Sequence, residues 1–584
     1  MKILLTAVNA KFIHSSLALR SLKKYASKYS ENIFLKEFTI NQETDFILSE
    51  IYKEKPDVIG FSCYIWNMGI ISELVENLKK ILPKAIIILG GPEVSYESEE
   101  VLIENPYADI IIRGEGEITF LELSEYFIDN TIELSNIDGI TYRNNKNEIL
   151  STPKRKAAIL DDIPFVYDDM TDLENRIIYY ETQRGCPYNC QYCLSSIEKG
   201  VRFLSEERVK SDLQFFIDNN VKQVKFVDRT FNCNKKHAMM IWKYIMDNDN
   251  GITNFHMEIT ADIMDNEALE LLKNARKGLF QFEIGVQSTN PKTIEAIKRN
   301  TSFEGLTEIV KKIKDLGNIH EHLDLIAGLP YEDYNSFTNS FNDVFALEPE
   351  QLQLGFLKLL KGSGLRRDAE KYGIVYRRRP NYEVLYTKEI SYGEMERLKL
   401  VEEMTETYYN SGKALNTIKY ITSIYTSPFD FFQDLGDYWE SKGHHAVKHS
   451  KMELFQIMYS FSLENNILKD KSDIIKELLR FDIFAGDNVK TLPNDLCGEN
   501  KDIKEKIFTF YKNEANIEKY TPNLKDFSYQ QISRMCHIEL FKYNVFDIVK
   551  NPKNNIVENE TAVLFNYYKK DEISNKPVYY KIEI

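Results

Sequence analysis

Over the first 142 residues, segments with the apolar pattern of a strand alternate with segments with the apolar pattern of a helix. Short β-branched runs are separated by stretches with helical spacing, and Leu74, Leu78, Ile81 and Leu82 would give one helix a buried stripe. This alternation is typical of a parallel sheet joined by crossover helices. The pattern predicts a doubly wound, Rossmann-like α/β domain over residues 1–142, with strands at Lys2–Val8, Ile33–Phe38, Val58–Ser62, Ala85–Leu89 and Asp109–Ile112.

The alternation resumes after residues 143–175, which are rich in Asn, Lys, Asp and Pro and predict a linker. A second α/β domain is expected over 176–375. From Ser391 to about Ile483 apolar residues recur at helical spacing, as at Met395, Leu398, Val401 and Met404. A mainly helical C-terminal domain is therefore predicted over 376–584. The strands expected in the second domain are Ile177–Glu181, Gln223–Val227, Asn254–Ile259, Leu279–Ile284, His322–Leu325 and Leu352–Phe356.

Composition narrows the function classes. A chain of 584 residues is too long for a single core, and its net charge of −15 argues against nucleic acid as a substrate, RNA modification included. Because no apolar run approaches the ~20 residues that span a bilayer, no membrane span is expected. The seven cysteines are too few for a disulfide framework and suit a reducing compartment, so we expect a cytoplasmic protein. If some of these cysteines hold an exposed metal cluster, the protein would also be sensitive to oxygen and suited to anaerobic conditions.

Three of the seven cysteines, Cys186, Cys190 and Cys193, fall in one Cys-x3-Cys-x2-Cys loop. A four-iron, four-sulfur cubane has one iron at each metal corner, so three thiolates would hold it and leave one iron open to another ligand. A closed zinc site instead needs four ligands, usually as two separated pairs, and Cys233 with His237 could complete one. The single loop motif favours the iron–sulfur cluster.

The cysteine loop, with Tyr192 directly before its last cysteine, resembles the signature of radical S-adenosylmethionine (SAM) enzymes. The resemblance implies that the open iron binds the amino and carboxylate groups of SAM, that Tyr192 lies near its adenine, and that the six strands form a partial (β/α)6 barrel. Barrel sites lie at the C-terminal strand ends. A structural partner could equally satisfy Glu258, which the resemblance makes a ribose ligand. The SAM contacts that the resemblance implies are Asp228, Arg229, Thr230, Glu258, Gln287, Ser288 and Gly328.

Polar residues and glycines also follow the strands of the first domain, where ligands of doubly wound sheets bind. Each of them could simply form a strand-to-helix turn. Ahead of a radical SAM loop, however, the set resembles the cobalamin-binding domain of cobalamin-dependent radical SAM enzymes. The Asp-x-His-x-x-Gly motif that supplies a cobalt ligand in many cobalamin proteins is absent, so a cobalt without a lower histidine is expected. The residues concerned are Asn9, Ser62, Gly90, Gly91, Pro92, Glu93, Gly114, Glu115 and Gly116.

The resemblance implies an enzyme with three cofactors, a [4Fe-4S] cluster, SAM and cobalamin, and an external electron donor such as a flavodoxin or ferredoxin. It implies reductive cleavage of SAM and favours methylation of an unactivated carbon of an unknown small molecule. Rearrangement or cyclisation without methyl transfer stays open, as does a cobalamin- or redox-sensing binding protein. The C-terminal segment resembles an uncharacterised domain attached to some of these enzymes. The basic islands 362–367 and 376–380 fit a solvated face or a site for an anionic substrate or electron donor.

Overall fold

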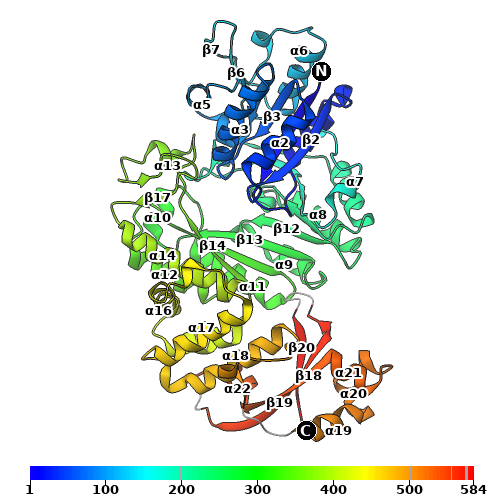
Figure 1. The fold of residues 1–584 in the computed structure, drawn as a ribbon, viewed down its shortest axis with the longest axis vertical. Helices are drawn as coiled ribbons and strands as arrows, with labels where there is room; N and C mark the ends of the chain where they lie inside the picture. Colours follow the sequence, from blue (N-terminus) through cyan, green and yellow to red (C-terminus); the bar gives the residue numbers. More distant parts are fainter. Residues whose placement is uncertain (198, 499–502, 554–555, 572–575) are drawn as a thin grey trace.

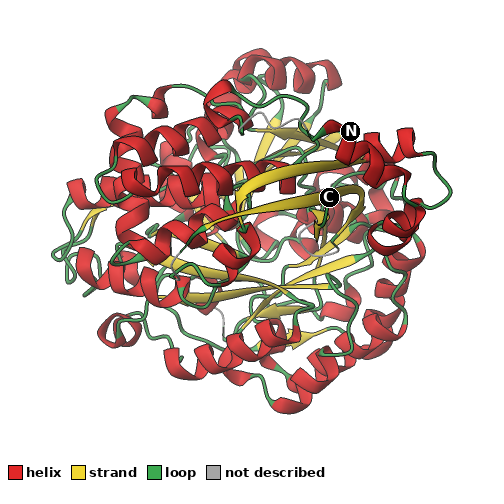
Figure 2. Ribbon diagram, turned by 90° about the horizontal axis from the view of Figure 1, so that it is seen from below, coloured by secondary structure: helices red, strands yellow, loops and turns green. Residues whose placement is uncertain are grey.

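The computed structural model describes residues 1–584 except 198, 499–502, 554–555 and 572–575. Along the long axis, the N-terminal α/β domain occupies one end, the barrel lies in the middle and the C-terminal helices and strands occupy the other end (Figure 1). Helices lie largely outside the strands when the molecule is viewed along that axis (Figure 2). The predicted α/β fold with a largely helical C-terminal part is confirmed.

The N-terminal domain is built on a seven-stranded sheet with the order β2-β1-β3-β4-β5-β6-β7, in which the first five strands are parallel. Six of the seven residues of β1 are buried, as expected for a parallel strand covered on both faces. Strand β2 lies on one side of β1, whereas β3 and the strands that follow it lie on the other side. The carboxyl ends of β1 and β3 therefore form the topological switch point. The strands are β1 (Ile3–Asn9), β2 (Ile33–Thr39), β3 (Val58–Ser62), β4 (Ile86–Gly90), β5 (Ile110–Ile112), β6 (Ile140–Arg143) and β7 (Ile149–Ser151).

Two layers of helices cover this sheet. Leu19 and Phe120 pack in the apolar cluster on one face, and Ile51, Leu74 and Val101 pack in the cluster on the other. The predicted strands are present within one residue of their expected ends, but β6 and β7 extend the sheet antiparallel into the segment predicted as a linker. The helices are α1 (Leu17–Tyr25), α2 (Thr44–Glu54), α3 (Met68–Ile81), α4 (Pro92–Ser95), α5 (Ser98–Glu104) and α6 (Glu117–Ile128).

The middle domain is an open parallel barrel with the strand order β15-β14-β13-β12-β11-β8, as the resemblance implied. Its strands are β8 (Ile178–Tyr180), β11 (Gln223–Phe226), β12 (Asn254–Ile259), β13 (Phe280–Gln287), β14 (His320–Ala327) and β15 (Gln351–Phe356). Its outer helices are α7 (Glu206–Asp218), α8 (Lys235–Asp247), α9 (Asn266–Leu272), α10 (Pro291–Ala296), α11 (Phe303–Leu316) and α12 (Tyr334–Phe345). Helix α11 shows why these boundaries form: the Ser302 side chain caps its start, and Gly317, at φ 69°, ends it in the left-handed region.

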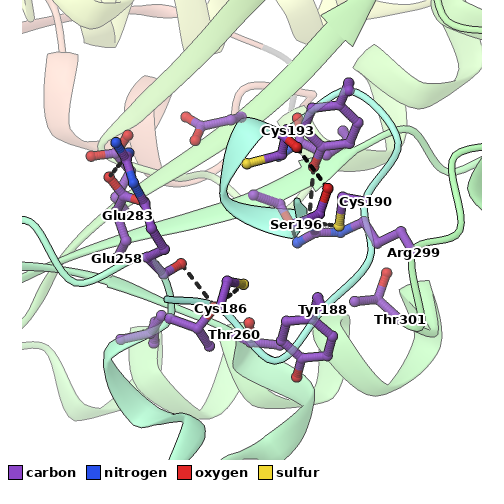
Figure 3. A pocket seen from close by; sticks show the side chains of 17 residues that line it. Cys186, Tyr188, Cys190, Cys193, Ser196, Glu258, Thr260, Glu283, Arg299 and Thr301 are labelled. Carbon is purple, nitrogen blue, oxygen red and sulfur yellow. Dashed lines mark hydrogen bonds and ion pairs between the residues drawn. The ribbon is translucent and has the colours of Figure 1, made fainter. Parts of the chain in front are cut away.

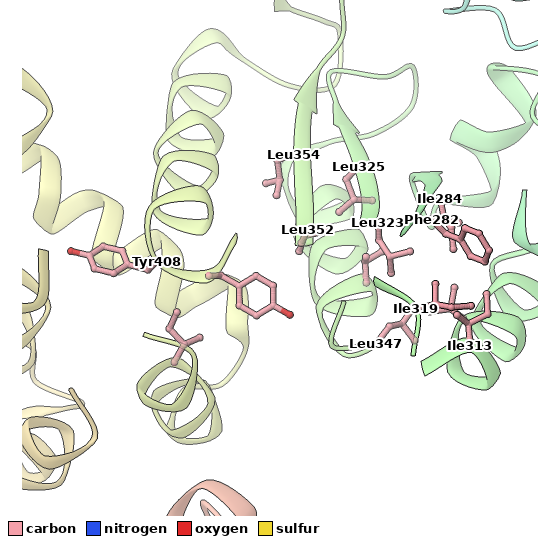
Figure 4. Packing of buried hydrophobic residues seen from close by; sticks show 14 of the residues in the cluster. Phe282, Ile284, Ile313, Ile319, Leu323, Leu325, Leu347, Leu352, Leu354 and Tyr408 are labelled. Carbon is pink, nitrogen blue, oxygen red and sulfur yellow. The ribbon is translucent and has the colours of Figure 1, made fainter. Parts of the chain in front are cut away.

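The C-terminal region packs against the β15 side of the barrel and shares its core. Leu352 and Leu354 of β15 belong to the same buried cluster as Tyr408, which lies in a π-helical turn, Thr405–Asn410 (Figure 4). The region begins with α13 (Gly364–Arg367) and the short strands β16 (Val375–Tyr376) and β17 (Val384–Tyr386). Its main helices are α14 (Tyr392–Met404), α15 (Leu415–Ile424), α16 (Pro428–Ser441), α17 (Lys451–Glu464) and α18 (Ser472–Gly486).

A three-stranded antiparallel sheet completes this region and was not expected from the sequence. Its outer strands, β18 (Cys536–Tyr543) and β20 (Pro577–Ile582), pair on either side of β19 (Glu558–Lys570). The remaining helices are α19 (Lys504–Lys512), α20 (Glu514–Tyr520), α21 (Tyr529–Met535) and α22 (Val545–Lys550). None of the helices within the described residues combines the length and apolar character that a bilayer span requires.

Candidate functional site

The three cysteines lie on one loop that is closed at its base by a small hairpin. Strand β9 (Gln183–Gly185) pairs antiparallel with β10 (Val201–Phe203), and the chain between them carries the cysteines. Gly185 has φ 105°, and a side chain there would meet the Gly200 carbonyl oxygen at 2.2 Å. Only glycine therefore allows the two strands to close. The three thiols face one cavity of about 180 Å³ at the barrel mouth (Figure 3).

Backbone hydrogen bonds hold this loop on both sides. The Gln191 N–H donates to the Ile297 carbonyl at 2.9 Å, and the Gln191 carbonyl accepts from the Leu365 N–H at 2.8 Å. At the loop's entry, the buried Asp228 carboxylate accepts the N–H groups of Thr182 at 2.9 Å and Gln183 at 3.0 Å. Asp228 was predicted to contact SAM. The structure places it outside the cavity lining, where it positions the chain that leads into the cysteine loop.

Arg299 is the cation nearest the thiols. Its Nη1 atom donates to the Tyr192 hydroxyl at 3.1 Å and lies 4.0 Å from the Cys190 sulfur, and Nη2 donates to the Gly285 carbonyl at 2.5 Å. Burial raises the pKa of the Cys190 thiol, while the Arg299 charge opposes that rise. This arginine therefore favours a thiolate or another anionic group beside it.

Three carboxylates from adjacent strands line the same cavity: Glu258 on β12, Glu283 on β13 and Asp324 on β14. Burial, with the charges of Glu283 and Glu258, raises the pKa of Asp324 to about 8. Burial also raises the pKa of Glu258, and the Arg229 guanidinium 3.8 Å away opposes it. Asp324 therefore carries a proton near neutral pH, whereas Glu283 is ionised, because His256 and Lys225 outweigh its burial and hold its pKa at about 2.

The barrel lumen below these carboxylates is also polar. Lys225 Nζ lies 2.9 Å and His256 Nε2 3.0 Å from the Glu283 carboxylate, and the Gln281 amide lies 2.7 Å from His322 Nε2. Burial and the neighbouring histidines lower the pKa of His322 to about 3. Lys225 and His256 thus contact Glu283, while Gln281 and His322 contact each other.

The other residues predicted to contact SAM divide between the cavity and its support. Arg229, Thr230 and Gln287 line it, and the buried Gln287 Oε1 atom has no hydrogen-bond partner among the described residues. Ser288 instead donates to Glu332 at 2.5 Å behind the site. Gly328, at φ 86°, makes a turn, and a side chain there would meet Met395 at 3.3 Å.

The two side chains that could have completed a zinc site with the loop have other partners. Cys233 Sγ lies 3.5 Å from the Gln183 side-chain oxygen, and His237 Nε2 lies 3.2 Å from the Thr182 hydroxyl. The three loop cysteines instead share a cavity with Arg299, whose positive charge suits an anionic thiolate cluster. The donor set and the space therefore fit the predicted [4Fe-4S] group.

In the first domain, Asn9, Ser62 and Gly90 end three neighbouring parallel strands, so they lie together at one sheet edge. The Asn67 side chain donates to the carbonyls of Ser62 at 2.9 Å and Val8 at 3.0 Å, which fixes this edge. Gly91 has φ 114°, and a side chain there would approach the Cys63 carbonyl oxygen to 2.6 Å. Gly91 thus allows close backbone packing at the carboxyl ends of these strands.

An aromatic pair lies beside that edge and was not predicted from the sequence. Tyr64 and Trp66 follow β3 and stack with ring centroids 4.3 Å apart and an interplanar angle of 8°. Trp66 is 45% exposed, although it is large and apolar. Such a platform suits the flat face of a macrocyclic ligand.

Two acidic residues predicted to contact cobalamin hold the domains together instead. Glu93 is buried and accepts a hydrogen bond from the Tyr382 hydroxyl, with Lys361 Nζ 3.4 Å away. Glu115 pairs with Arg202 of the cysteine hairpin and lies 3.4 Å from Arg184.

The residues next to Glu93 and Glu115 shape the backbone of the two turns in which these acids lie. Pro92 starts the short helix α4, and the Gly114 N–H donates to the Ser95 hydroxyl at 3.1 Å. Gly116 precedes α6, and a side chain there would meet Leu22 at 3.0 Å. Gly116 thus lets its turn pack against α1, whereas Gly114, at φ 75°, adopts a left-handed backbone conformation.

Sequence comparison matches three family models to the chain in order: the B12 binding domain over residues 3–124, the radical SAM superfamily over 180–344, and a protein of unknown function (DUF4080) over 370–565. The chain therefore contains a B12 binding domain followed by a radical SAM domain. The predicted family and its cofactors, cobalamin, a [4Fe-4S] cluster and SAM, are therefore confirmed.

Among curated relatives, an uncharacterized methyltransferase of Pyrococcus horikoshii is 29% identical over 48% of this radical SAM chain and 62% of its own length. The cobalamin-dependent radical SAM methyltransferase TokK of Streptomyces tokunonensis is 24% identical over 55% of the chain and 50% of its own. An anaerobic magnesium-protoporphyrin IX monomethyl ester cyclase of Rubrivivax gelatinosus is 21% identical over 54% and 59%. The chain thus spans about half to three fifths of the length of these relatives.

Two solved structures share the fold. The cobalamin-dependent S-adenosylmethionine radical enzyme OxsB aligns with a TM-score of 0.59 and 14% identity, over 82% of this chain and 83% of that one. The radical S-adenosylmethionine methyltransferase TsrM from Kitasatospora setae aligns with a TM-score of 0.52 and 16% identity, over 65% of this chain and 80% of that one. At these identities the likeness concerns the fold.

Proposed function

We propose that this protein is a cobalamin-dependent radical SAM enzyme that methylates an unactivated carbon of a small-molecule substrate. The observation that carries the proposal is one cavity that three cysteines, a buried arginine and three carboxylates share at a barrel mouth. When bound, the reduced cluster supplies the electron that cleaves SAM to a 5′-deoxyadenosyl radical, which can take hydrogen from carbon, and cobalamin supplies the methyl group.

The cavity residues would then have distinct tasks. Cys186, Cys190 and Cys193 hold the cluster, and Arg299 offsets the negative charge gathered there. Gln287 has a buried acceptor without a partner among the described residues, so it can accept a hydrogen bond from a hydroxyl or amino group of the bound SAM. Glu258 can do the same from its side of the cavity. The neutral Asp324 can donate one.

In the first domain, Asn9, Ser62, Gly90 and Gly91 form the edge against which cobalamin would bind, with Trp66 offering an aromatic face. Glu93 and Glu115, in contrast, hold this edge against the start of the C-terminal region through Tyr382 and against the cysteine hairpin through Arg202. Their task in the proposal is to fix the distance between the two cofactor sites.

Methyl transfer is favoured over ring formation because relatives from Pyrococcus horikoshii and Streptomyces tokunonensis are methyltransferases by name. Cyclisation is the second candidate, since similar chains are named as cyclases. The same proposal includes a division of the chain into domains at 1–142, 176–375 and 376–584. It also includes a cytoplasmic location and an external electron donor.

The test is isotopic. Reduced, reconstituted enzyme is incubated anaerobically with methyl-labelled SAM and a cell extract, and extract metabolites are searched for label. We expect 5′-deoxyadenosine together with one labelled product. Accumulation of 5′-deoxyadenosine without any labelled product would favour the cyclase alternative. An enzyme with a full cluster that makes no 5′-deoxyadenosine would contradict catalysis and favour a sensing role.

A further inference from the structure

A second cavity, of about 320 Å³, lies on the outer side of the cysteine loop. Its lining includes the exposed cations Lys199, Lys298 and Arg367, together with Asn189 and Gln191 of the cysteine loop itself. We call this cavity the basic hollow. It includes part of the basic island 362–367 noted in the sequence.

The basic hollow and the cluster cavity share a wall. Ser196 lines both cavities, and Asn189 and Gln191, which line the hollow, are the chain neighbours of Cys190, whose thiol faces the cluster cavity. The cysteine loop thus separates the two spaces by little more than its own thickness. An electron that enters from solvent at this point has a short path to the thiols.

Positive charge collects in the hollow, in contrast to the rest of the molecule. The chain carries a net charge of −15, yet no described residue that lines the hollow has a carboxylate. Within the described part of the chain, the side chains of Lys199, Lys298 and Arg367 make no ion pair or hydrogen bond. Ile197, also in the lining, is 37% exposed and adds an apolar contact.

The same contacts that hold the cysteine loop fix the cations. Lys298 directly follows Ile297, whose carbonyl accepts the Gln191 N–H, and Arg367 stands two residues after Leu365, whose N–H donates to the Gln191 carbonyl. A side chain at Gly364 would lie 2.1 Å from the Gln191 amide oxygen, so this segment packs directly on the loop. The backbones that carry Lys298 and Arg367 are therefore held against the loop.

We propose that the basic hollow is the docking surface for a small acidic electron-transfer protein that reduces the cluster. This inference rests on the proposed function. One electron leaves the reduced donor and enters the oxidised cluster, whose core charge falls from +2 to +1, and no bond forms or breaks in this protein. Clustered charge of one sign raises the association rate of an oppositely charged partner by about 10- to 10³-fold at low salt, which an acidic donor needs against an acidic acceptor.

The experiment uses the reconstituted full-length enzyme and a bacterial flavodoxin in its fully reduced form. Stopped-flow bleaching of the cluster absorption gives the second-order rate constant of reduction at low and high salt. The test variant is the triple charge reversal Lys199→Glu, Lys298→Glu and Arg367→Glu. The same variant is reduced with photoreduced 5-deazariboflavin, a small donor that needs no docking surface.

A matched control carries Lys146→Glu, Lys311→Glu and Lys525→Glu, three exposed lysines that line neither cavity, with the same change in net charge. We expect the test variant to lose at least about tenfold in rate with flavodoxin at low salt, to differ less at high salt, and to match wild type with deazariboflavin. The control variant should keep most of the wild-type rate of reduction by flavodoxin.

Equal rates for wild type and test variant with flavodoxin, or an equal loss in the control, would overturn the docking surface. Failure of the proposed function is separate: the cluster would be reduced by flavodoxin in wild type, but no 5′-deoxyadenosine would form from SAM.

Discussion

Replacing Arg299 by methionine removes a partly buried cation that lies beside the predicted cluster. The substitution keeps a long apolar side chain but deletes the donors to Tyr192 and Gly285 and the charge 4.0 Å from the Cys190 sulfur. Leaving two acceptors without partners should lower the free energy of unfolding by about 2–5 kcal/mol. The larger consequence is electrostatic.

With an effective dielectric constant of about 20, a unit charge at 4 Å contributes about 4 kcal/mol. The added electron is spread over the cluster, whose far corner is more distant from Arg299. The interaction energy between the electron and the Arg299 charge is therefore half of that value, or about 2 kcal/mol. For a one-electron couple this corresponds to roughly 80 mV. The reduction potential of Arg299→Met should therefore be more negative than that of wild type by roughly 80 mV.

The assay is a potentiometric titration of the reconstituted enzyme followed by electron paramagnetic resonance. Arg299→Lys, which keeps the charge, should restore most of the potential. Arg276→Met serves as the control, because Arg276 is a partly buried arginine that pairs with Asp249 at 2.7 Å and does not line the cluster cavity. Equal potentials in wild type and Arg299→Met, or an equal shift in Arg276→Met, would refute the electrostatic reasoning.

The folded pKa of Asp324, about 8, lies above its ordinary value of 3.8, so unfolding releases its proton and stability falls as the pH rises between those values. Asp324→Asn should remove up to about 1.4 kcal/mol of that fall per pH unit in denaturant titrations, and an unchanged slope would contradict the assignment. Arg184→Met breaks the 2.9 Å pair with the buried Glu117 and should cost about 3–5 kcal/mol in thermal or denaturant unfolding, whereas a loss below 1 kcal/mol would count against a tight domain interface. Trp66→Ala should weaken hydroxocobalamin binding about tenfold in equilibrium dialysis, and the exposed Phe508→Ala should not; equal affinities would remove Trp66 from the site.

The fold could be predicted because strand and crossover patterns are local. Short, largely apolar runs such as Val58–Ser62 specify strands buried on both faces, and parallel order follows from the helices between them. The C-terminal sheet was missed because its strands follow a long helical region and pair antiparallel, so no alternation with helices marks them. Strand β7 was missed for a different reason: residues 149–151 pair with β6 in a local hairpin, but they lie in a segment rich in Asn, Lys, Asp and Pro.

The site could be predicted only where chemistry is concentrated in a motif. Cys186, Cys190 and Cys193 share one loop. Arg299 comes from a turn after α10, and only the folding of the barrel brings this turn next to the cysteine loop. Glu283 lies within a predicted strand and Asp324 within another, and their polar character in apolar runs was a usable signal. Glu93 follows a glycine pair, and this place suggested a ligand contact; its contacts with Tyr382 and Lys361 depend on the folded chain and could not be predicted from the sequence.

The most direct test of the account is iron speciation by Mössbauer spectroscopy and metal analysis on anaerobically reconstituted protein. We predict four irons per chain, one of which changes its spectrum when SAM is added, and loss of the cluster in Cys186→Ala, Cys190→Ala and Cys193→Ala but not in Cys233→Ala. Bound zinc in place of iron, or full iron content with unchanged spectra in Cys190→Ala, would contradict a three-cysteine cluster with one open iron.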